Sequence, residues 1–135
     1  NGRITTSVEV EGDEHCEVDH SRVLQILMNL IANARHAIHD TGRAEGKIKI
    51  KIARLDEAIR VAVIDDGVGI PPADLDRIFG HGFTTRADGH GFGLHHSANA
   101  ATEMGGKLWA ESAGPGQGAA FTFELPAATL CGAVP

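Results

Sequence analysis

Apolar and polar residues alternate in several short stretches of the chain, as in strands that bury one face and expose the other. The clearest stretch is residues 47–53, where lysine and isoleucine alternate in the sequence KIKIKIA. Residues 59–64 (IRVAVI) follow after a polar turn at Asp56-Glu57, so the two stretches together predict a hairpin. The same pattern predicts further strands at residues 4–10, 107–110 and 119–125.

Helical spacing of apolar residues predicts three helices. From Val23 to Ile38 these residues recur every three or four positions, with Asp19 as a candidate N-cap and Thr41-Gly42 as the end of the helix. Residues 80–92 are rich in glycine and show little periodicity, so we expect a long loop there. The predicted helices are residues 20–39, 73–78 and 93–104.

The predicted order of elements indicates an α+β fold. Strand, helix, two strands, loop, helix and two strands suit a two-layer sandwich, with helices on one face of a mixed, mostly antiparallel sheet. The chain has 135 residues, the length of one domain. We therefore expect a single domain over residues 1–135, with its core at about 4–126 and a frayed tail at 127–135.

Composition argues against several classes of function. Hydrophobic residues make up 42% and charged residues 22%, as in a soluble globular protein. The net charge of -6 argues against nucleic acid as a partner. Cys16 and Cys131 lack CxxC spacing, which is typical of a reduced, cytoplasmic chain. No apolar run reaches the length of a membrane span, so we expect no direct membrane contact by this domain, although a longer parent protein could be anchored in the inner membrane.

Two asparagines interrupt the apolar pattern of the long helix. Asn29 and Asn33 are four residues apart and therefore lie on the same helical face. A buried amide needs hydrogen-bond partners, so each could simply bind a neighbouring loop. The functional alternative is that an asparagine carbonyl oxygen ligates Mg²⁺, a cation that prefers oxygen ligands.

A turn-rich segment follows directly after a predicted strand. It begins with Asp65-Asp66 and continues Gly67-Val68-Gly69-Ile70. Alone, this pattern could be a plain strand exit with glycines at positive φ. A carboxylate at the strand end could also accept a hydrogen bond from the exocyclic amine of adenine, with glycine beyond it to admit a flat ring.

Two glycine-containing segments follow. In Phe79–Arg86 (FGHGFTTR) the phenylalanines could seat the loop on the core, and Arg86 is a candidate phosphate contact. Gly89–Leu94 (GHGFGL) opens a helix, and backbone N–H groups at a helix N-terminus bind anions. It does not follow a strand, so a dinucleotide fold is disfavoured. A triphosphate fits such a site.

These four motifs, in this order, resemble those of the Bergerat-fold ATPases and kinases, and most of all the catalytic domains of sensor histidine kinases. NLIANARHA resembles the N box, DDGVGI the first glycine box, IFGHGFTTR the F box and GHGFGL the second glycine box. GPGQGAAFTFELP resembles the last glycine box and the closing strand. The similarity runs from about residue 17 to residue 126.

The resemblance implies that the chain binds Mg²⁺ and ATP. Asn33 would be the principal Mg²⁺ ligand with Asn29 nearby, Asp65 would receive the adenine amine, and Arg86 would contact the γ-phosphate. Asn29, Asn33 and Arg86 are thus the candidate catalytic residues. His36 matches a position where some members carry a basic residue, and is a further phosphate candidate. The remaining candidates for cofactor binding are Gly67, Gly69, Ile70, Phe79, Thr84, Thr85, Gly89, Gly91, Phe92, Gly93 and Leu94.

The sequence also departs from the family pattern. Asp66 stands where asparagine is common, and Phe92 where leucine is common. His95 and His96 are unusual after the second glycine box. No pair among the eight histidines has convincing zinc spacing, so we expect them to be solvated or locally bonded. Residues 80–92 would form a lid over the phosphates, and their glycine content predicts mobility without nucleotide.

One position favours a kinase over an ATPase. The resemblance implies that members of the family that hydrolyse ATP carry a glutamate four residues before the Mg²⁺ ligand, where it acts as a base. This chain has Asn29 at that position. A histidine acceptor carries its own lone pair, so we expect a protein-histidine kinase domain. The chain has no acceptor histidine in a suitable context, so the partners would be a separate dimerisation and phosphoacceptor domain and, downstream, a response regulator. The alternatives are an independent ATPase and a regulatory module that binds nucleotide without catalysis.

Overall fold

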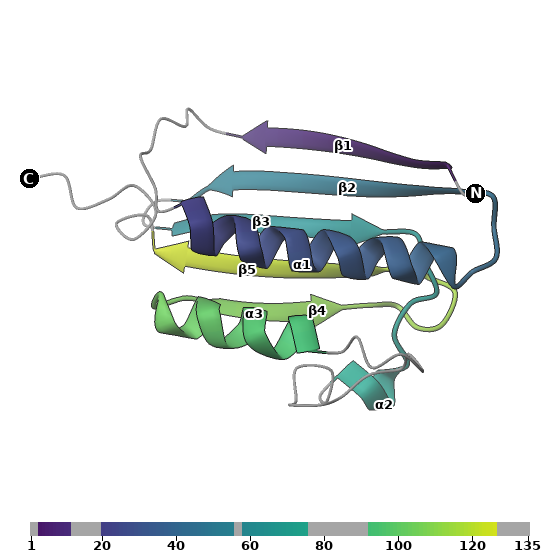
Figure 1. Cartoon of the computed structure of the whole chain (residues 1–135). Helices are drawn as coiled ribbons and strands as arrows, with labels where there is room; N and C mark the ends of the chain where they lie inside the picture. Colours follow the sequence, from purple (N-terminus) through teal and green to yellow (C-terminus); the bar gives the residue numbers. More distant parts are fainter. Residues whose placement is uncertain (1–2, 12–19, 56–57, 76–91, 127–135) are drawn as a thin grey trace, which may run out of the picture.

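A computed structural model describes residues 3–11, 20–55, 58–75 and 92–126. Five strands form one sheet, and α1 and α3 lie on the same face of it (Figure 1). The predicted α+β class, with a mixed sheet and helices on one face, is therefore confirmed. In chain order the elements are β1 (Arg3–Glu11), α1 (His20–His39), β2 (Glu45–Arg54), β3 (Ala58–Asp65), α2 (Pro72–Leu75), α3 (Phe92–Glu103), β4 (Lys107–Glu111) and β5 (Ala119–Pro126).

The predicted elements match this order closely. The helix predicted over 20–39 has those bounds, and each predicted strand lies within an observed one. The short helix predicted over 73–78 appears as α2, and its last three positions lie outside the described residues. Also outside them are the other predicted local features: Asp19, the turn at Asp56-Glu57, the tail at 127–135, and the loop at 80–92 up to residue 91.

The strand order in the sheet is β1-β2-β3-β5-β4. β1 pairs in parallel with β2, from Arg3 opposite Glu45 to Glu11 opposite Ala53. Parallel neighbours need a crossover connection, and α1 lies in that connection. All other neighbouring strands are antiparallel, with Asp65 at the end of β3 opposite Ala119 at the start of β5.

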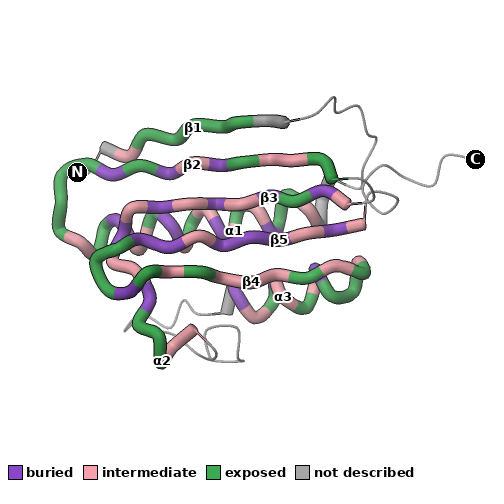
Figure 2. Tube along the Cα trace, turned by 180° about the vertical axis from the view of Figure 1, so that it is seen from behind, coloured by how far each residue is buried: buried purple, intermediate pink, exposed green. Residues whose placement is uncertain are grey.

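The core lies between the sheet and the two longer helices. Apolar residues four apart on α1 are buried against inward-facing residues of the three central strands. Viewed from behind, the strands lie in front of the helices, and exposed residues alternate with buried ones along β2 (Figure 2). The buried residues of α1 are Ile26, Leu30, Ala34 and Ile38, and those of the central strands include Ile48, Val63 and Phe123.

The chain leaves α1 through the predicted turn. The Thr41 hydroxyl donates a hydrogen bond to the carbonyl of Ile38 at 2.6 Å, and Gly42 has φ +76°. A left-handed residue reverses the chain at little cost only when it is glycine. The turn brings the next residues back to the start of β2. Among the described residues, no helix is long and apolar enough to cross a membrane.

Candidate functional site

Asp65 ends β3 on the face of the sheet that the helices cover. It follows Ile59, Val61 and Val63 in the strand alternation, and its exposed fraction is 5%. One carboxylate oxygen, Oδ1, accepts a hydrogen bond from the N–H of Gly67 at 2.8 Å. The other, Oδ2, is buried and has no hydrogen-bond partner in the described part of the chain. Since buried polar atoms are nearly always paired, this oxygen is available to a donor from a ligand.

Burial also changes the acidity of this carboxyl. Desolvation raises the pKa of Asp65 from 3.8 to about 6. The N–H groups of Gly67 and Ala119 act in the opposite direction, and the negative charge of Asp66 adds to the increase. The carboxyl is therefore mostly ionised at neutral pH, as an acceptor for two donors should be.

The glycines after Asp65 pack closely against other elements. A Cβ on Gly67 would lie 2.7 Å from Cβ of Ala37 in α1, and the N–H of Val68 donates to the carbonyl of Ala37 at 3.1 Å. Gly69 has φ +78°, and a Cβ there would collide with the carbonyl oxygen of Gly114. The first glycine box is thus packed between the long helix and the loop that joins β4 to β5.

The β4–β5 loop holds the segment after Asp65 by hydrogen bonds. The N–H of Gly116 donates to the carbonyl of Val68 at 2.6 Å. The Ser112 hydroxyl accepts a hydrogen bond from the N–H of Ile70 at 3.0 Å and donates to the carbonyl of Gly118 at 2.7 Å. These contacts fix the path of the chain as it leaves the carboxylate.

The two asparagines of α1 lie on one half-buried face of the helix. The Asn29 amide donates a hydrogen bond to the Ser97 hydroxyl of α3 at 3.1 Å, and Ser97 is only 1% exposed. Asn33, one turn further along, makes no side-chain hydrogen bond with the described residues, so its carbonyl oxygen is open to a cation. His36 is half-buried on the same helix. This arrangement fits Mg²⁺ held by Asn33, with Asn29 oriented by α3.

The helix α3 begins at Phe92, within the second glycine box. Its first backbone N–H groups have no partners inside the helix, as at every helix N-terminus. The side chain of Leu94 is buried in the core, as is that of Ile70 after the first glycine box. The side chains of these two candidates therefore pack in the core and hold the neighbouring glycine-containing segments in place. Gly93 has no side chain and can offer only backbone groups to a ligand.

Six predicted site residues fall outside the part of the chain that the structure describes. They are Phe79, Thr84, Thr85, Arg86, Gly89 and Gly91. The predicted lid lies almost entirely in the same segment. The roles expected for these residues stay predictions.

Several residues that build the site carried no recognisable motif. Ser97 could be placed on the core face of α3 by its spacing from Leu94, but nothing in the sequence pointed to Asn29 as its partner. Ser112 was likewise missed, and Ala37 lies at the end of the N box but was given no role, because their contacts join segments far apart in the chain.

A cavity of about 370 Å³ lies at the same end of the sheet, and Asp65 is among the residues that line it. Its lining includes Ile64, Glu111 and Ala120, which lie on the face of the sheet without helices. Neither asparagine of α1 contributes to it. The candidate site is instead the end of the sheet on the helical face, between Asp65, α1 and the start of α3.

Comparison with known proteins gives a family match. Residues 18–129 match the family described as histidine kinase-, DNA gyrase B-, and HSP90-like ATPase. The chain belongs to this family. Among curated members it is 44% identical over 111 residues to the sensor histidine kinase ZraS of Klebsiella oxytoca, and 30% identical over 120 residues to the sensor histidine kinase WalK of Bacillus subtilis. These alignments cover 82% and 84% of this chain but only 23% and 19% of the relatives, so the chain spans less than a quarter of their length.

Solved structures of the family show the same fold. The catalytic domain of histidine kinase ThkA superimposes with a TM-score of 0.76 at 36% identity, covering 91% of this chain and 78% of the other. Full-length ShkA in complex with AMPPNP gives a TM-score of 0.77 at 30% identity, covering 91% of this chain and 25% of that one. The resemblance to histidine kinase catalytic domains is therefore confirmed in both sequence and fold.

Proposed function

We propose that this domain binds Mg²⁺-ATP and transfers the γ-phosphoryl group to a histidine on a separate dimerisation domain, within two-component signal transduction. The observation that carries the proposal is the buried carboxylate of Asp65, which has one oxygen without a partner in the described chain. The glycine-containing turn that follows it packs against the glycine-rich loop between β4 and β5. The family match supports nucleotide binding. The sensor histidine kinases among its members support phosphoryl transfer to histidine rather than hydrolysis.

The adenine end of the nucleotide would be recognised by Asp65. Oδ1 is already occupied by the N–H of Gly67, which leaves Oδ2 to accept the exocyclic amine. The turn at Gly67 and Gly69 is held between α1 and the β4–β5 loop, so the acceptor is fixed before a base arrives. Such preorganisation lowers the entropic cost of binding. The analogue AMPPNP bound to ShkA is a nucleotide of the same class.

The phosphate end would lie toward α1 and the start of α3. Asn33 offers a carbonyl oxygen for Mg²⁺, and the first N–H groups of α3 offer donors to phosphate oxygens. Bound Mg²⁺ supplies charge neutralisation on the phosphates, which is the main electrostatic requirement of phosphoryl transfer. Arg86 and His36 are the proposed additional phosphate contacts.

Asn29 favours transfer to histidine over hydrolysis. Its amide donates to Ser97 and cannot accept a proton at neutral pH, so this position offers no base for activating water. A neutral imidazole nitrogen would attack the γ-phosphorus with its own lone pair and has no proton to lose at that atom. The bond from the γ-phosphorus to the β–γ bridging oxygen would break, ADP would leave, and the other ring nitrogen would then release its proton to solvent. The residues of the site then act by positioning the nucleotide.

The partners follow from the same reaction. The acceptor histidine would belong to a dimerisation domain of the parent kinase, and a response regulator would take the phosphoryl group from it. A ThkA structure with the response regulator TrrA, at 34% identity and a TM-score of 0.70, is a complex of this kind in a relative. We place the domain in the cytoplasm, where ATP and reduced cysteines occur together.

Phosphorylation assays test the transfer step. The isolated chain incubated with Mg²⁺-ATP is expected to bind nucleotide without forming phosphohistidine, whereas joining it to the dimerisation domain of its parent restores phosphorylation. Asn33→Ala in the joined protein should abolish the product. Stable phosphohistidine on the isolated chain, or ATP turnover by it that Asn29→Ala removes, would contradict the proposal and support an independent ATPase in the second case.

A further inference from the structure

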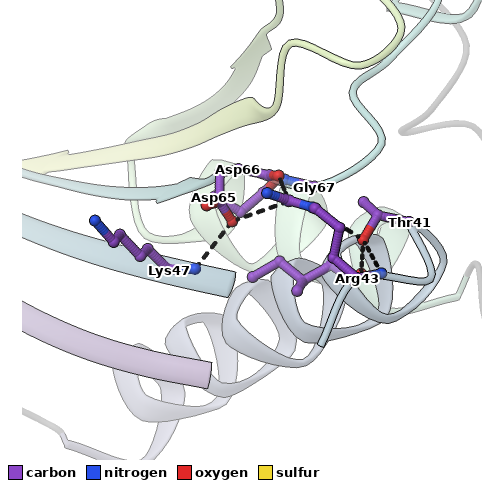
Figure 3. Close-up of polar contacts among 7 residues, drawn as sticks. Thr41, Arg43, Lys47, Asp65, Asp66 and Gly67 are labelled. Atoms are coloured by element: carbon purple, nitrogen blue, oxygen red, sulfur yellow. Dashed lines mark hydrogen bonds and ion pairs between the residues drawn. The ribbon is translucent and has the colours of Figure 1, made fainter. Parts of the chain in front are cut away.

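Asp66, the residue after the adenine-accepting carboxylate, is the position where asparagine is common in the family. Its carboxylate does not point into the core as that of Asp65 does. Instead, Oδ1 of Asp66 accepts a hydrogen bond from the backbone N–H of Lys47 at 2.9 Å, at the start of β2 (Figure 3). The turn after β3 is thereby attached to the neighbouring strand.

Arg43 approaches Asp66 from the turn between α1 and β2. Its guanidinium lies 3.4 Å from the Asp66 carboxylate and donates a hydrogen bond to the Asp66 backbone carbonyl. The arginine is itself oriented by Thr41, whose hydroxyl accepts hydrogen bonds from the backbone N–H of Arg43 at 3.0 Å and from its Nε at 3.2 Å. Thr41 in turn caps α1 through Ile38. A chain of contacts thus joins the end of the long helix to the adenine-binding turn (Figure 3).

This ion pair is half-exposed, so its value for stability alone is small. The side chains of Arg43 and Asp66 are 48% and 42% exposed, and solvent-exposed pairs typically contribute little to folding. The pair lies, however, directly beside two site residues. Gly67, whose N–H orients Asp65, is the next residue in the chain. Any displacement of Asp66 therefore moves the donor that aligns the acceptor oxygen of Asp65.

The charge of Asp66 also acts on Asp65. The strands paired with Asp65 place uncharged residues opposite it, Ile48 of β2 and Ala119 of β5, and α1 packs on the following Gly67 through Ala37. The neighbouring charge is that of Asp66 in the same turn. The negative charge of Asp66 opposes ionisation of Asp65 and raises its pKa. Arg43 neutralises that charge, because the guanidinium is always protonated.

We propose that Arg43 and Asp66 form a positioning pair, which aligns Asp65 for the base of the nucleotide and allows an aspartate to stand at this second position. The proposal rests on the nucleotide-binding function proposed above. Neither residue needs to touch the nucleotide, since both act through the turn and through the charge beside Asp65. Arg43 lies outside all the motifs that resemble the family.

The test compares Arg43→Gln, Arg43→Lys, Asp66→Asn and Asp66→Ala with the unchanged chain. The carboxyl carbon of Asp65 is followed by NMR as a function of pH, without nucleotide, and AMPPNP affinity is measured by calorimetry at pH 7.5. Arg60→Gln is the matched control, because it breaks a surface ion pair of the same kind, Arg60–Glu124 at 2.7 Å, on the sheet face without helices. The ligand's own titration is the same for every variant and cancels in the comparison.

Opposite shifts are the expected signature. Arg43→Gln should move the Asp65 titration to higher pH and Asp66→Asn to lower pH, each by a few tenths of a pH unit, on the order expected for a half-exposed charge. Arg43→Lys should restore the unchanged midpoint, which a purely structural role of the guanidinium would not predict. Asp66→Ala, which also removes the acceptor for Lys47, should weaken AMPPNP binding about two- to tenfold more than Asp66→Asn does.

The outcomes separate this inference from the function on which it rests. If AMPPNP binds and neither the Asp65 midpoint nor the affinity changes beyond the Arg60→Gln control, the positioning pair is wrong while nucleotide binding stands. If the Asp65 midpoint shifts in opposite directions but no variant binds AMPPNP, the coupling exists without the function, and the proposal as stated is overturned.

Discussion

At Asp65, the requirements of folding and of ligand binding conflict. The residue is buried, with an exposed fraction of 5%, by the same strand alternation that buries three aliphatic residues before it, yet one of its carboxylate oxygens has no partner in the described chain. Folding alone would favour an apolar or neutral residue at this point. Under the proposed function, a nucleotide would supply the missing donor.

Replacing Asp65 with asparagine should therefore stabilise the free protein at neutral pH. The folded state holds the proton of Asp65 up to about pH 6, whereas the unfolded chain releases it near 3.8, so the free energy of unfolding falls as pH rises through this window. The full shift corresponds to about 3 kcal/mol. Asparagine avoids this cost but leaves a buried amide N–H unpaired, so we expect a net gain of about 1–2 kcal/mol at pH 7.5.

Chemical denaturation at two pH values checks this expectation. The gain should shrink or reverse at pH 4, where the native carboxyl is mostly protonated. Glu45→Gln, an exposed substitution at the start of β2, should change stability by less than about 0.5 kcal/mol at both pH values. Destabilisation by Asp65→Asn at pH 7.5 would show that the carboxylate has a structural partner.

The contact between Asn29 and Ser97 is a second residue-scale feature with a measurable consequence. Ser97→Ala removes the acceptor of the Asn29 amide, and we expect a loss of about 1 kcal/mol in the free energy of unfolding. In a double-mutant cycle with Asn29→Ala, the interaction free energy between the two side chains should account for most of that loss. Thr102→Ala, which removes only an exposed hydrogen bond within α3, is the control. Additive losses would mean that the two side chains do not interact.

The candidate residues differed in how far the sequence could place them. Asp65 could be predicted, because a carboxylate directly after an alternating strand must lie at the strand end and on a known face. Ser97 and Arg43 could not, because a serine on a helix and an arginine in a turn are common, and their meaning depends on partners 68 and 23 residues away.

At the scale of elements, the glycines of the site serve two different purposes. Gly42 and Gly69 both have φ near +77°, namely +76° and +78°. A Cβ on Gly42 would meet nothing within 4 Å, whereas one on Gly69 would collide with the backbone carbonyl of Gly114. The first glycine is required by conformation alone, and the second by conformation and close packing together.

Alanine substitution separates these two requirements. Gly42→Ala should lower the free energy of unfolding by about 1 kcal/mol, the cost of a left-handed alanine. Gly69→Ala should cost distinctly more, about 3 kcal/mol or above, because the backbone of two loops must also move. Urea unfolding of both variants gives the comparison. Equal losses would mean that the close contact between the loops adds nothing.

The boundaries of helices and strands were largely predictable, whereas the contacts between loops were not. Alternation at residues 47–53 and helical spacing from Val23 to Ile38 define elements within a few positions, because each pattern reflects burial on one face. The packing of Gly69 on Gly114 joins two turns that are 45 residues apart, and nothing local in either turn specifies the other.

At the scale of the whole molecule, the sheet is unevenly supported. β3 and β5 are central, each has two neighbouring strands, and Val63, Phe123 and Leu125 are fully buried. β1 lies at an edge, pairs only with β2, and is exposed from Thr5 to Glu9. The sequence predicted a mixed sheet, but not this strand order, since a lone alternating strand carries no information about its neighbour.

Hydrogen exchange should follow this asymmetry. Amides of β3 and β5 should exchange only through opening near the global free energy of unfolding, whereas those of β1 should exchange through local opening at least about 100-fold faster. NMR-detected exchange at pH 7 measures both sets in one sample. Equal protection of β1 and β5 would show that β1 belongs to the same cooperative unit as the core.

The measurement that tests the account most directly is calorimetric titration of this chain with AMPPNP, with and without Mg²⁺, beside Asp65→Asn. We expect saturable binding that Mg²⁺ strengthens and that Asp65→Asn abolishes, although the variant is folded and more stable at pH 7.5. Binding by Asp65→Asn as tight as that of the unchanged chain, or no binding by the unchanged chain, would contradict the assignment of Asp65 as the acceptor for adenine.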